Sequence, residues 1–215
     1  MTEISKRILT SFLMISLFLI SLLNNYLLFF LLIICFYLTF YEFFAILDKI
    51  FINRHKINFV LSLFIILLIL SYIFGFSWYS LSIGTEKDKI YLLLIISISV
   101  SSDIGGYFFG KLFKGRKLSK ISPNKTISGM IGAYFLSFLI VIYSFKSYIN
   151  SETLLIIIFL VSTISQLGDL FISYLKRKSK LKDTGKILPG HGGILDRFDG
   201  LIFAILIGSI IKIFI

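Results

Sequence analysis

The chain has 215 residues, of which 57% are hydrophobic and only 15% charged, and its formal net charge is +11 at pH 7. A mean hydropathy of +0.96 excludes an ordinary soluble globular domain, in which about a quarter of the residues are charged. A single cysteine excludes a disulfide framework and a multi-cysteine metal centre within this sequence. We therefore expect an all-α polytopic membrane protein with one integral membrane domain over residues 1–215.

Seven apolar runs follow one another along the chain, most of them near the length of about 20 residues that a helix needs to cross a bilayer. They predict spans near residues 8–23, 26–47, 58–76, 90–110, 129–146, 153–175 and 198–215. The first run is short, and Asn24-Asn25 follows it, so a tight turn or a helical hairpin that does not cross fully is an alternative that leaves six spans. We divide the domain into apolar amino-terminal helices (1–90) and a catalytic carboxyl-terminal part (91–215).

Lysine and arginine are distributed unevenly between the predicted loops. Alternate loops hold 18 of the 22 basic residues, and 13 of these lie in two loops, 111–125 and 176–197. Because basic residues accumulate on the cytoplasmic side of a membrane, the amino terminus and these loops are predicted to be cytoplasmic and the carboxyl terminus external. The topology rule and attraction to anionic lipid explain part of this charge, and an anionic substrate at the cytoplasmic interface explains its concentration in two loops.

Three acidic side chains lie in or near apolar spans, where a charge costs about 2.5–3.5 kcal/mol at the helix centre. Asp169 lies seven residues before Lys176, or roughly 10 Å along a helix, so water and a metal ion can reach it from the cytoplasm. Asp103 either pairs with a basic residue of the following loop or helps to bind substrate. Glu42 is interpreted as a snorkelling or paired acid near the end of the second span.

The predicted helix around Asp169 carries a polar face. Its members recur at three- and four-residue spacing and are Ser162, Ser165, Gln166, Asp169, Ser173, Lys176 and Arg177. One interpretation is that serine and glutamine join helices together while Asp169 pairs with a lysine. The interpretation that we favour makes Asp169 a metal-binding carboxylate, with Gly168 allowing close approach of the backbone.

Two polar segments interrupt the apolar pattern. Residues 122–129 read SPNKTISG and are expected to open the fifth span, where hydroxyls, free N–H groups and Lys125 can bind phosphate oxygens, although a plain capped helix start explains them as well. Residues 189–193 read PGHGG, and glycines there allow N–H groups to approach an anion. His191 either stabilises this turn or contacts phosphate or a metal-bound water, and His55 is interpreted as a surface loop residue.

Residues 173–199 resemble the signature of the phosphatidate cytidylyltransferases, also called CDP-diacylglycerol synthases. The matching residues are Ser173, Lys176, Arg177, Lys182, Asp183, His191, Gly192, Gly193, Asp196, Arg197 and Asp199. The segment 122–129 is similar to the S-P-K-K-T-x-E-G segment of the same family, but Asn124 replaces the first lysine and Ser128 the glutamate. Any family role of those two side chains is therefore in doubt, whereas Ser122, Lys125 and Thr126 match.

The resemblance implies transfer of a cytidylyl group from CTP to phosphatidic acid, with release of pyrophosphate. Carboxylates at an oxygen-rich site suit Mg²⁺, so Asp169 and Asp196 are the expected metal ligands, with a second cation as an alternative. Asp199 and Asp183 are expected to support the metal or a bound water. The expected phosphate-binding side chains are Lys125, Lys176, Arg177, Lys182 and Arg197, and the other expected substrate-binding residues are Asp103, Ser122, Thr126, Ser173 and His191.

The expected partners are CTP, phosphatidic acid and the lipid bilayer, in the inner membrane of the cell. Family members are described as dimeric, which makes a homodimer an expectation, and no nucleic-acid partner is expected. Two alternatives stay open: a CTP-dependent transferase or kinase that acts on another lipid, and a cation-coupled transporter, which also uses intramembrane aspartates. Inverted repeats favour a transporter, and none is apparent in the sequence.

Overall fold

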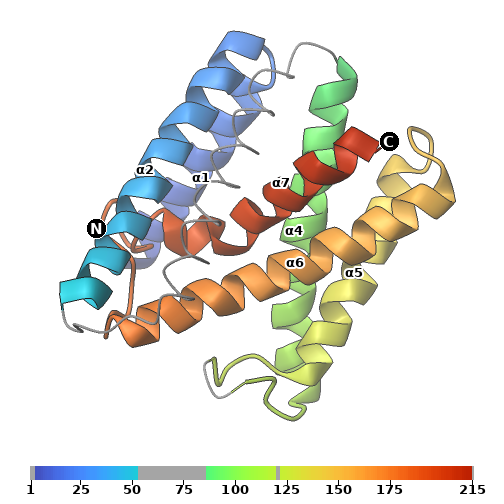
Figure 1. Ribbon diagram of the computed structural model, residues 1–215. Helices are drawn as coiled ribbons and strands as arrows, with labels where there is room; N and C mark the ends of the chain where they lie inside the picture. Colours follow the sequence, from blue (N-terminus) through green and yellow to red (C-terminus); the bar gives the residue numbers. More distant parts are fainter. Residues whose placement is uncertain (1–2, 53–85, 120–121, 215) are drawn as a thin grey trace. The chain divides into compact units, whose positions relative to one another are not determined.

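The computed structural model describes residues 3–52, 86–119 and 122–214. The elements described there are all helices (Figure 1): α1 (Glu3–Ser21), α2 (Asn25–Ile52), α4 (Glu86–Phe113), α5 (Ile127–Phe145), α6 (Ser151–Lys178) and α7 (Leu195–Phe214). They coincide with six of the seven predicted spans. The third predicted span, near 58–76, lies outside the described residues, as does His55.

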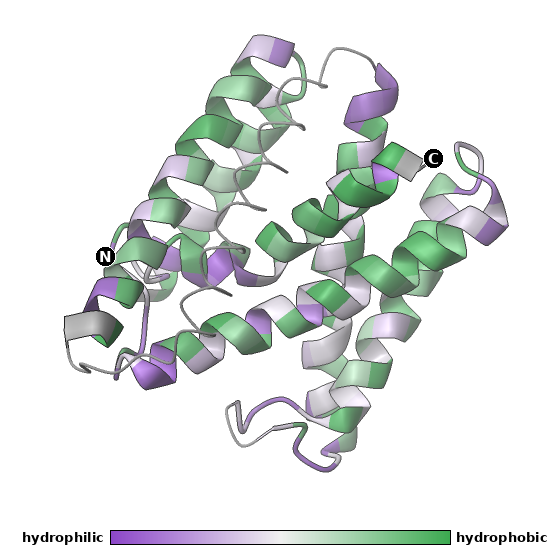
Figure 2. Ribbon diagram, viewed as in Figure 1, coloured by the Kyte–Doolittle hydropathy of each residue, from purple (hydrophilic) through white to green (hydrophobic). Residues whose placement is uncertain are grey.

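Five of these helices are long and apolar enough to cross a membrane by length and composition: α1, α2, α4, α5 and α6. In Figure 2 hydrophobic residues dominate α1, α2 and α5, whereas hydrophilic residues gather in the loop between α4 and α5. Large apolar side chains such as Phe12 and Phe30 remain 68% and 60% exposed, as expected for helices whose outer surface meets lipid. The chain is therefore an all-helical, multi-pass membrane protein.

The chain divides into two compact units. The first unit comprises the described residues 3–52, 86–89 and 175–198, and the second comprises 90–174, without 120 and 121, together with 199–214. The predicted division at residue 90 into amino-terminal helices and a catalytic part stays a prediction.

In the first unit α1 and α2 pack against each other as a helical hairpin. Asn24 makes the turn between them: its N–H donates to the carbonyl of Ser21 at 3.3 Å, and its side-chain oxygen accepts from the N–H of Tyr26 at 2.9 Å. An asparagine in this position caps the helix that follows. The tight turn predicted at Asn24-Asn25 is thereby confirmed.

Close helix contacts in the second unit depend on small residues. A Cβ atom at Gly105 of α4 would collide with the backbone carbonyl of Gly132 in α5, and one at Gly168 of α6 would collide with the ring of Phe203 in α7. Gly168 thus allows the close approach of the backbone that was expected from the sequence, and the group that approaches it is the ring of Phe203. Small residues at such contacts let helix backbones approach closely where no hydrophobic effect drives association.

Buried serines add hydrogen bonds between α4 and α6. The hydroxyls of Ser99 and Ser165 lie 2.9 Å apart, those of Ser102 and Ser162 lie 3.0 Å apart, and all four side chains are buried. Each pair satisfies two polar groups that neither lipid nor the apolar core could satisfy. The helix-joining role that the alternative interpretation gave to serines on the polar face of α6 is confirmed for Ser162 and Ser165.

Candidate functional site

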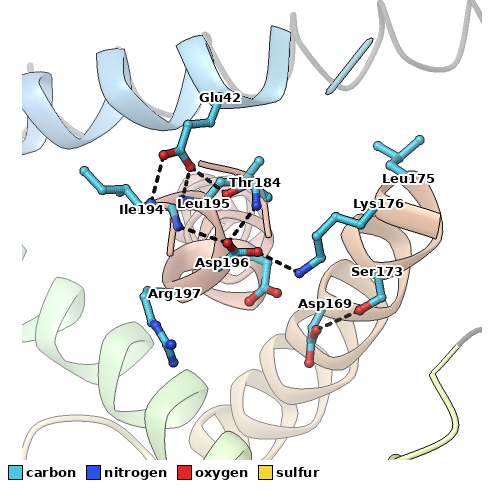
Figure 3. Close-up of polar contacts among 12 residues, drawn as sticks. Glu42, Asp169, Ser173, Leu175, Lys176, Thr184, Ile194, Leu195, Asp196 and Arg197 are labelled. Atoms are coloured by element: carbon cyan, nitrogen blue, oxygen red, sulfur yellow. Dashed lines mark hydrogen bonds and ion pairs between the residues drawn. The ribbon is translucent and has the colours of Figure 1, made fainter. Parts of the chain in front are cut away.

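In the first unit the carboxylate of Asp196 accepts hydrogen bonds from three donors (Figure 3). One oxygen accepts from the ammonium of Lys176 at 2.8 Å, and the other accepts from the backbone N–H groups of Thr184 at 2.8 Å and Gly193 at 3.1 Å. The side chains of Lys176 and Asp196 are only 16% and 8% exposed. The signature lysine and the signature aspartate therefore form one buried ion pair, braced by the main chain.

Two opposing effects act on the pKa of Asp196. Burial raises it, but the hydrogen bond from Lys176, the backbone N–H groups of Thr184 and Gly193 and the charge of Lys176 together lower it more. The pKa of this carboxyl therefore lies below its usual range, because each donor favours the charged form. Asp196 is consequently ionised at neutral pH.

A tight turn precedes α7 and explains the glycines of the PGHGG segment. Leu188 and Gly192 exchange backbone hydrogen bonds at 2.9 and 3.2 Å. Gly190 and Gly192 have φ angles of +79° and +87°, which side-chain-bearing residues rarely adopt. The N–H group of Gly193, expected to approach a ligand anion, approaches the carboxylate of Asp196 instead.

His191, at the tip of this turn, contacts the start of α1. Its Nδ1 atom lies 2.6 Å from the hydroxyl of Thr10, and its Nε2 atom lies 3.3 Å from that of Ser11. The guanidinium groups of Arg7 and Arg197 donate to the backbone carbonyls of Gly190 at 2.8 Å and His191 at 3.0 Å. Burial, Arg197 and Arg7 each lower the pKa of His191. These contacts are consistent with the predicted turn-stabilising role, and the predicted contact with phosphate or a metal-bound water stays a prediction.

Glu42 of α2 lies against Thr184, Ile194 and Leu195 of the same unit (Figure 3). Its carboxylate accepts from the hydroxyl of Thr184 at 2.7 Å and from the backbone N–H groups of Ile194 at 3.1 Å and Leu195 at 2.9 Å. The residue is only 2% exposed, and it forms no ion pair with the residues that the structure describes. Glu42 therefore does not snorkel to water, which corrects that part of its interpretation from the sequence; among the described residues its partners are hydrogen-bond donors.

The second unit contains a polar pocket of about 290 Å³. On one side an ion pair joins the ammonium of Lys125 to the carboxylate of Asp169, whose other oxygen lies 3.5 Å from the hydroxyl of Ser173. Lys125 and Asp169 are 26% and 27% exposed, so this ion pair is open to the pocket. The remaining polar side chains of the lining come from Ser102, Asp103, Tyr107, Ser122, Asn124, Thr126 and Gln166.

The loop before α5 supplies much of this pocket. Thr126 is the N-cap of α5, and its hydroxyl accepts from the N–H of Gly129 at 3.1 Å. A short antiparallel contact holds the loop, with Leu118 donating to the carbonyl of Lys125 at 2.8 Å. The capped helix start predicted from the sequence is confirmed, and it places Lys125 next to Asp169.

The predicted site residues thus fall into two groups. The first unit contains Lys176, Arg177, Lys182, Asp183, His191, Asp196 and Arg197; the second contains Asp103, Ser122, Lys125, Thr126, Asp169, Ser173 and Asp199. The predicted metal pair is divided between the units, so its geometry stays a prediction. Arg177 and Lys182 are exposed to solvent, where long cationic side chains can reach an anionic ligand.

The cytidylyltransferase family matches residues 60–214, which include every predicted site residue. The chain belongs to this family. It is similar to proteins named phosphatidate cytidylyltransferase from Rickettsia conorii, at 41% identity over 140 residues, and Staphylococcus haemolyticus, at 36% over 175 residues. A third, from Helicobacter pylori, is 39% identical over 133 residues.

These alignments cover 60%, 79% and 57% of this cytidylyltransferase-family chain and 61%, 66% and 48% of the respective relatives. The chain therefore spans less than two thirds of the length of the curated relatives that it matches. Membership of the family follows from the match, whereas the activity, substrates and partners of the whole protein are matters for proposal.

Four residues that lie next to the two groups of predicted site residues were not predicted as site residues from the sequence. Glu42, Thr10 and Ser11 precede the region that matches the family, and Gln166 lines the pocket beside Asp169. An acid within an apolar helix was the signal for Glu42, and the polar face of α6 was the signal for Gln166. Thr10 and Ser11 carried no comparable signal, because hydroxyls are common in spanning helices.

Proposed function

We propose that this chain transfers a cytidylyl group from CTP to phosphatidic acid, forming CDP-diacylglycerol and pyrophosphate. The family match and the shared name of the relatives support this activity. The observation that carries the proposal is the pairing of Lys176 with Asp196 beside the glycine turn. A buried carboxylate and ammonium, with the exposed cations of Arg177 and Lys182 in the same unit, suit a ligand that combines phosphates with a metal ion.

The proposed chemistry is an in-line displacement at the α-phosphorus of CTP. A phosphate oxygen of phosphatidic acid forms the new bond to this phosphorus, the bond to the bridging oxygen of the β-phosphate breaks, and pyrophosphate leaves with the electron pair. Such a reaction needs positioning and charge neutralisation, without a nucleophile from the protein. The side chains proposed to bind the phosphates are Lys125, Lys176, Arg177, Lys182 and Arg197.

We propose Asp169 and Asp196 as the residues that would hold Mg²⁺. Each carboxylate lies against an ammonium group, so each environment already accommodates a cation. Two carboxylates with water and phosphate oxygens are a typical ligand set for Mg²⁺, and Asp196 keeps one oxygen that bonds only to Lys176 among the described residues. When bound, the ion would neutralise negative charge on the triphosphate and the leaving pyrophosphate. Asp199 and Asp183 would support a bound water or a second cation.

The pocket of the second unit is proposed to bind part of the substrate. Asp103, Ser122, Thr126 and Ser173 contribute hydroxyl and carboxylate oxygens to it or to the Lys125–Asp169 pair. Its lining mixes these groups with the apolar side chains of Leu118, Met130 and Ala133, a composition typical of small-molecule sites. His191 would contribute indirectly by keeping its turn in place.

The proposed topology has seven spans, with the amino terminus and both polar loops in the cytoplasm of a cell with an inner membrane. CTP then enters from the cytoplasm and the lipid from the inner leaflet, and a homodimer is the expected assembly. A Cys35→Ser chain with a single cysteine at Lys182 or at Asn150 tests the orientation. In intact spheroplasts an impermeant maleimide should label the cysteine at position 150 and spare that at 182; the reverse pattern contradicts the topology.

The decisive experiment measures pyrophosphate release by purified protein in detergent with CTP, Mg²⁺ and dioleoyl phosphatidic acid. Wild-type protein should turn over with CDP-diacylglycerol as the lipid product, and Asp169→Asn and Asp196→Asn should lose this activity. Glu152→Gln is the matched control, because Glu152 is an exposed acid on the same helix as Asp169. An active Asp169→Asn protein contradicts the assignment, and turnover only with another lipid replaces the proposed acceptor.

A further inference from the structure

A carboxylate from outside the family match holds the segment that carries Asp196. Glu42 belongs to α2, whereas the match covers residues 60–214. Two of its three donors, Thr184 and Ile194, lie in the segment before α7, and the third, Leu195, is the first residue of α7. All four residues are buried, and they lie within one compact unit.

The beginning of α7 explains why a carboxylate is needed there. The first backbone N–H groups of a helix have no partner within the helix and usually bond to the side chain of the N-cap residue. Here Ile194 precedes the first helical residue, Leu195, and an isoleucine side chain has no oxygen to offer. Glu42 supplies the acceptor from a different helix, and its negative charge also complements the positive end of the α7 dipole.

Thr184 connects this cap to the catalytic carboxylate. Its hydroxyl donates to Glu42 and its backbone N–H donates to Asp196. Ile194 and Leu195, which bond to Glu42, immediately precede Asp196 in the chain. A shift of Glu42 therefore displaces Asp196 in two ways: through Thr184, which bonds to both carboxylates, and through the first turn of α7, which contains Asp196.

The space around the Glu42 carboxylate is tight. A Cβ atom at Gly185 or at Gly193 would collide with its oxygens. These two glycines thus have a steric reason to lack side chains that is separate from the positive φ angles at Gly190 and Gly192.

We propose that Glu42 is a positioning residue for the reaction: it caps α7 from α2 and so fixes Asp196 and its ion pair with Lys176 in the orientation that the substrate requires. The inference rests on the proposed function, because the reaction at Asp196 is itself proposed. It assigns a specific task to the apolar amino-terminal helices, which the family match does not cover. Misplacement of a catalytic group by about 1 Å can cost about a hundredfold in rate.

The test compares Glu42→Gln with wild type by hydrogen exchange of peptides covering residues 180–196 and by steady-state kinetics. Glutamine has one acceptor oxygen. Its amide nitrogen must therefore face at least one of the N–H groups that donate to Glu42 in the wild type, and that hydrogen bond is lost. We expect faster exchange in this stretch and a kcat lowered about ten- to a hundredfold, with KM for CTP changed less than kcat. Asp48→Asn, at an exposed acid on the same helix, should match wild type in both measurements.

Thr184→Val provides a second variant in case the glutamine variant does not fold. It removes one donor to Glu42 but keeps the backbone N–H that bonds to Asp196, so we expect a smaller loss of kcat and a smaller rise in exchange. Unchanged exchange in a folded Glu42→Gln protein contradicts the cap. Faster exchange with a wild-type kcat contradicts the positioning role. A wild-type protein that is inactive contradicts the proposed function instead, while the exchange experiment still tests the cap.

Discussion

The two lysine–aspartate pairs of this protein have the same chemistry but different surroundings. In the first unit the carboxylate of Asp196 is 8% exposed and accepts two backbone N–H groups besides Lys176. In the second unit Asp169 is 27% exposed, and besides Lys125 its only hydrogen-bond partner among the described residues is the hydroxyl of Ser173, at the long distance of 3.5 Å. The first carboxylate is part of its unit's internal structure, whereas the second lines a pocket.

The two units also position their carboxylates by different means. The first unit relies on hydrogen bonds from an irregular segment that Glu42 and the start of α1 hold on either side. The second relies on helices that pack closely through glycine and serine and carry Asp169 as a rigid element. From this comparison we expect that a substitution at Asp169 lowers activity with little loss of stability, whereas a substitution at Asp196 lowers both.

The largest expected effect tests this contrast directly. Asp169→Asn and Asp196→Asn should each lower kcat by about a thousandfold or more, since a metal-binding carboxylate supplies several kcal/mol of transition-state stabilisation. Asp196→Asn should also lower the free energy of unfolding by about 2 kcal/mol, because the NH₂ group of the asparagine must face a hydrogen-bond donor and one hydrogen bond is lost. Thermal unfolding in detergent measures the second effect, and equal melting temperatures for the two variants contradict the contrast.

The lysines test the same contrast through stability alone. Lys176→Met leaves Asp196 buried without its cation and should cost about 3 kcal/mol of stability. Lys125→Met leaves Asp169 without its cation at a site that is 27% exposed and open to the pocket, and it should cost less than about 1 kcal/mol. The matched pair of variants is compared by thermal unfolding in one detergent. A greater loss for Lys125→Met would reverse our ranking of the two environments.

Helix packing in the second unit predicts that alanine substitutions at the neighbouring glycines Gly105 and Gly106 have different effects on stability. Gly105→Ala should destabilise the protein by about 1–3 kcal/mol, because its methyl group meets the backbone carbonyl of Gly132. Gly106→Ala is the control: the nearest atom, the carbonyl oxygen of Gly129, is 3.7 Å from the added carbon, and alanine favours a helix by about 1 kcal/mol. Unfolding temperatures check both; similar losses at the two positions contradict the close approach of α4 and α5.

The smallest effect concerns the pH dependence of the turn at His191. Its pKa in the folded protein is lowered, first by burial and then by Arg197 and Arg7, so the folded state favours the neutral ring. The resulting stability is fully present above the unfolded pKa of about 6.5 and is lost as the pH falls toward the lower folded value. Because solvent screens this site, the change should be well under 1 kcal/mol, or about a few tenths.

Thermal unfolding of wild type and His191→Asn between pH 7.5 and about 5 checks whether stability falls on acidification. Wild type should lose more stability on acidification than the variant, which lacks the titrating ring. His55 is present in both proteins, so any contribution from it cancels in the comparison. A wild-type protein that gains stability relative to the variant at acid pH contradicts the lowered pKa.

Much of the helical framework and of the site chemistry was predictable from the sequence. Apolar runs of spanning length located six helices to within a few residues at most ends, because the bilayer demands continuous apolar segments. Thr126, three residues before Gly129, marked the capped start of α5, and the signature residues predicted that Lys176 and Asp196 serve one site. The third predicted span lies outside the described residues, and the metal pair and the orientation stay predictions.

The sequence by itself determined which segments of the described chain are helical and where charges interrupt them, because these depend on local composition and spacing. It also predicted which side chains bind phosphate and metal. Only the tertiary structure decided that Glu42 caps α7 across 152 residues of chain, that Thr10 and Ser11 meet His191, and that Gly168 accommodates Phe203. An apolar run shows from its length and composition that it can cross a membrane, but which helices it packs against depends on the shapes of their surfaces. A polar side chain within such a helix acquires its role from whichever donors the packing brings to it.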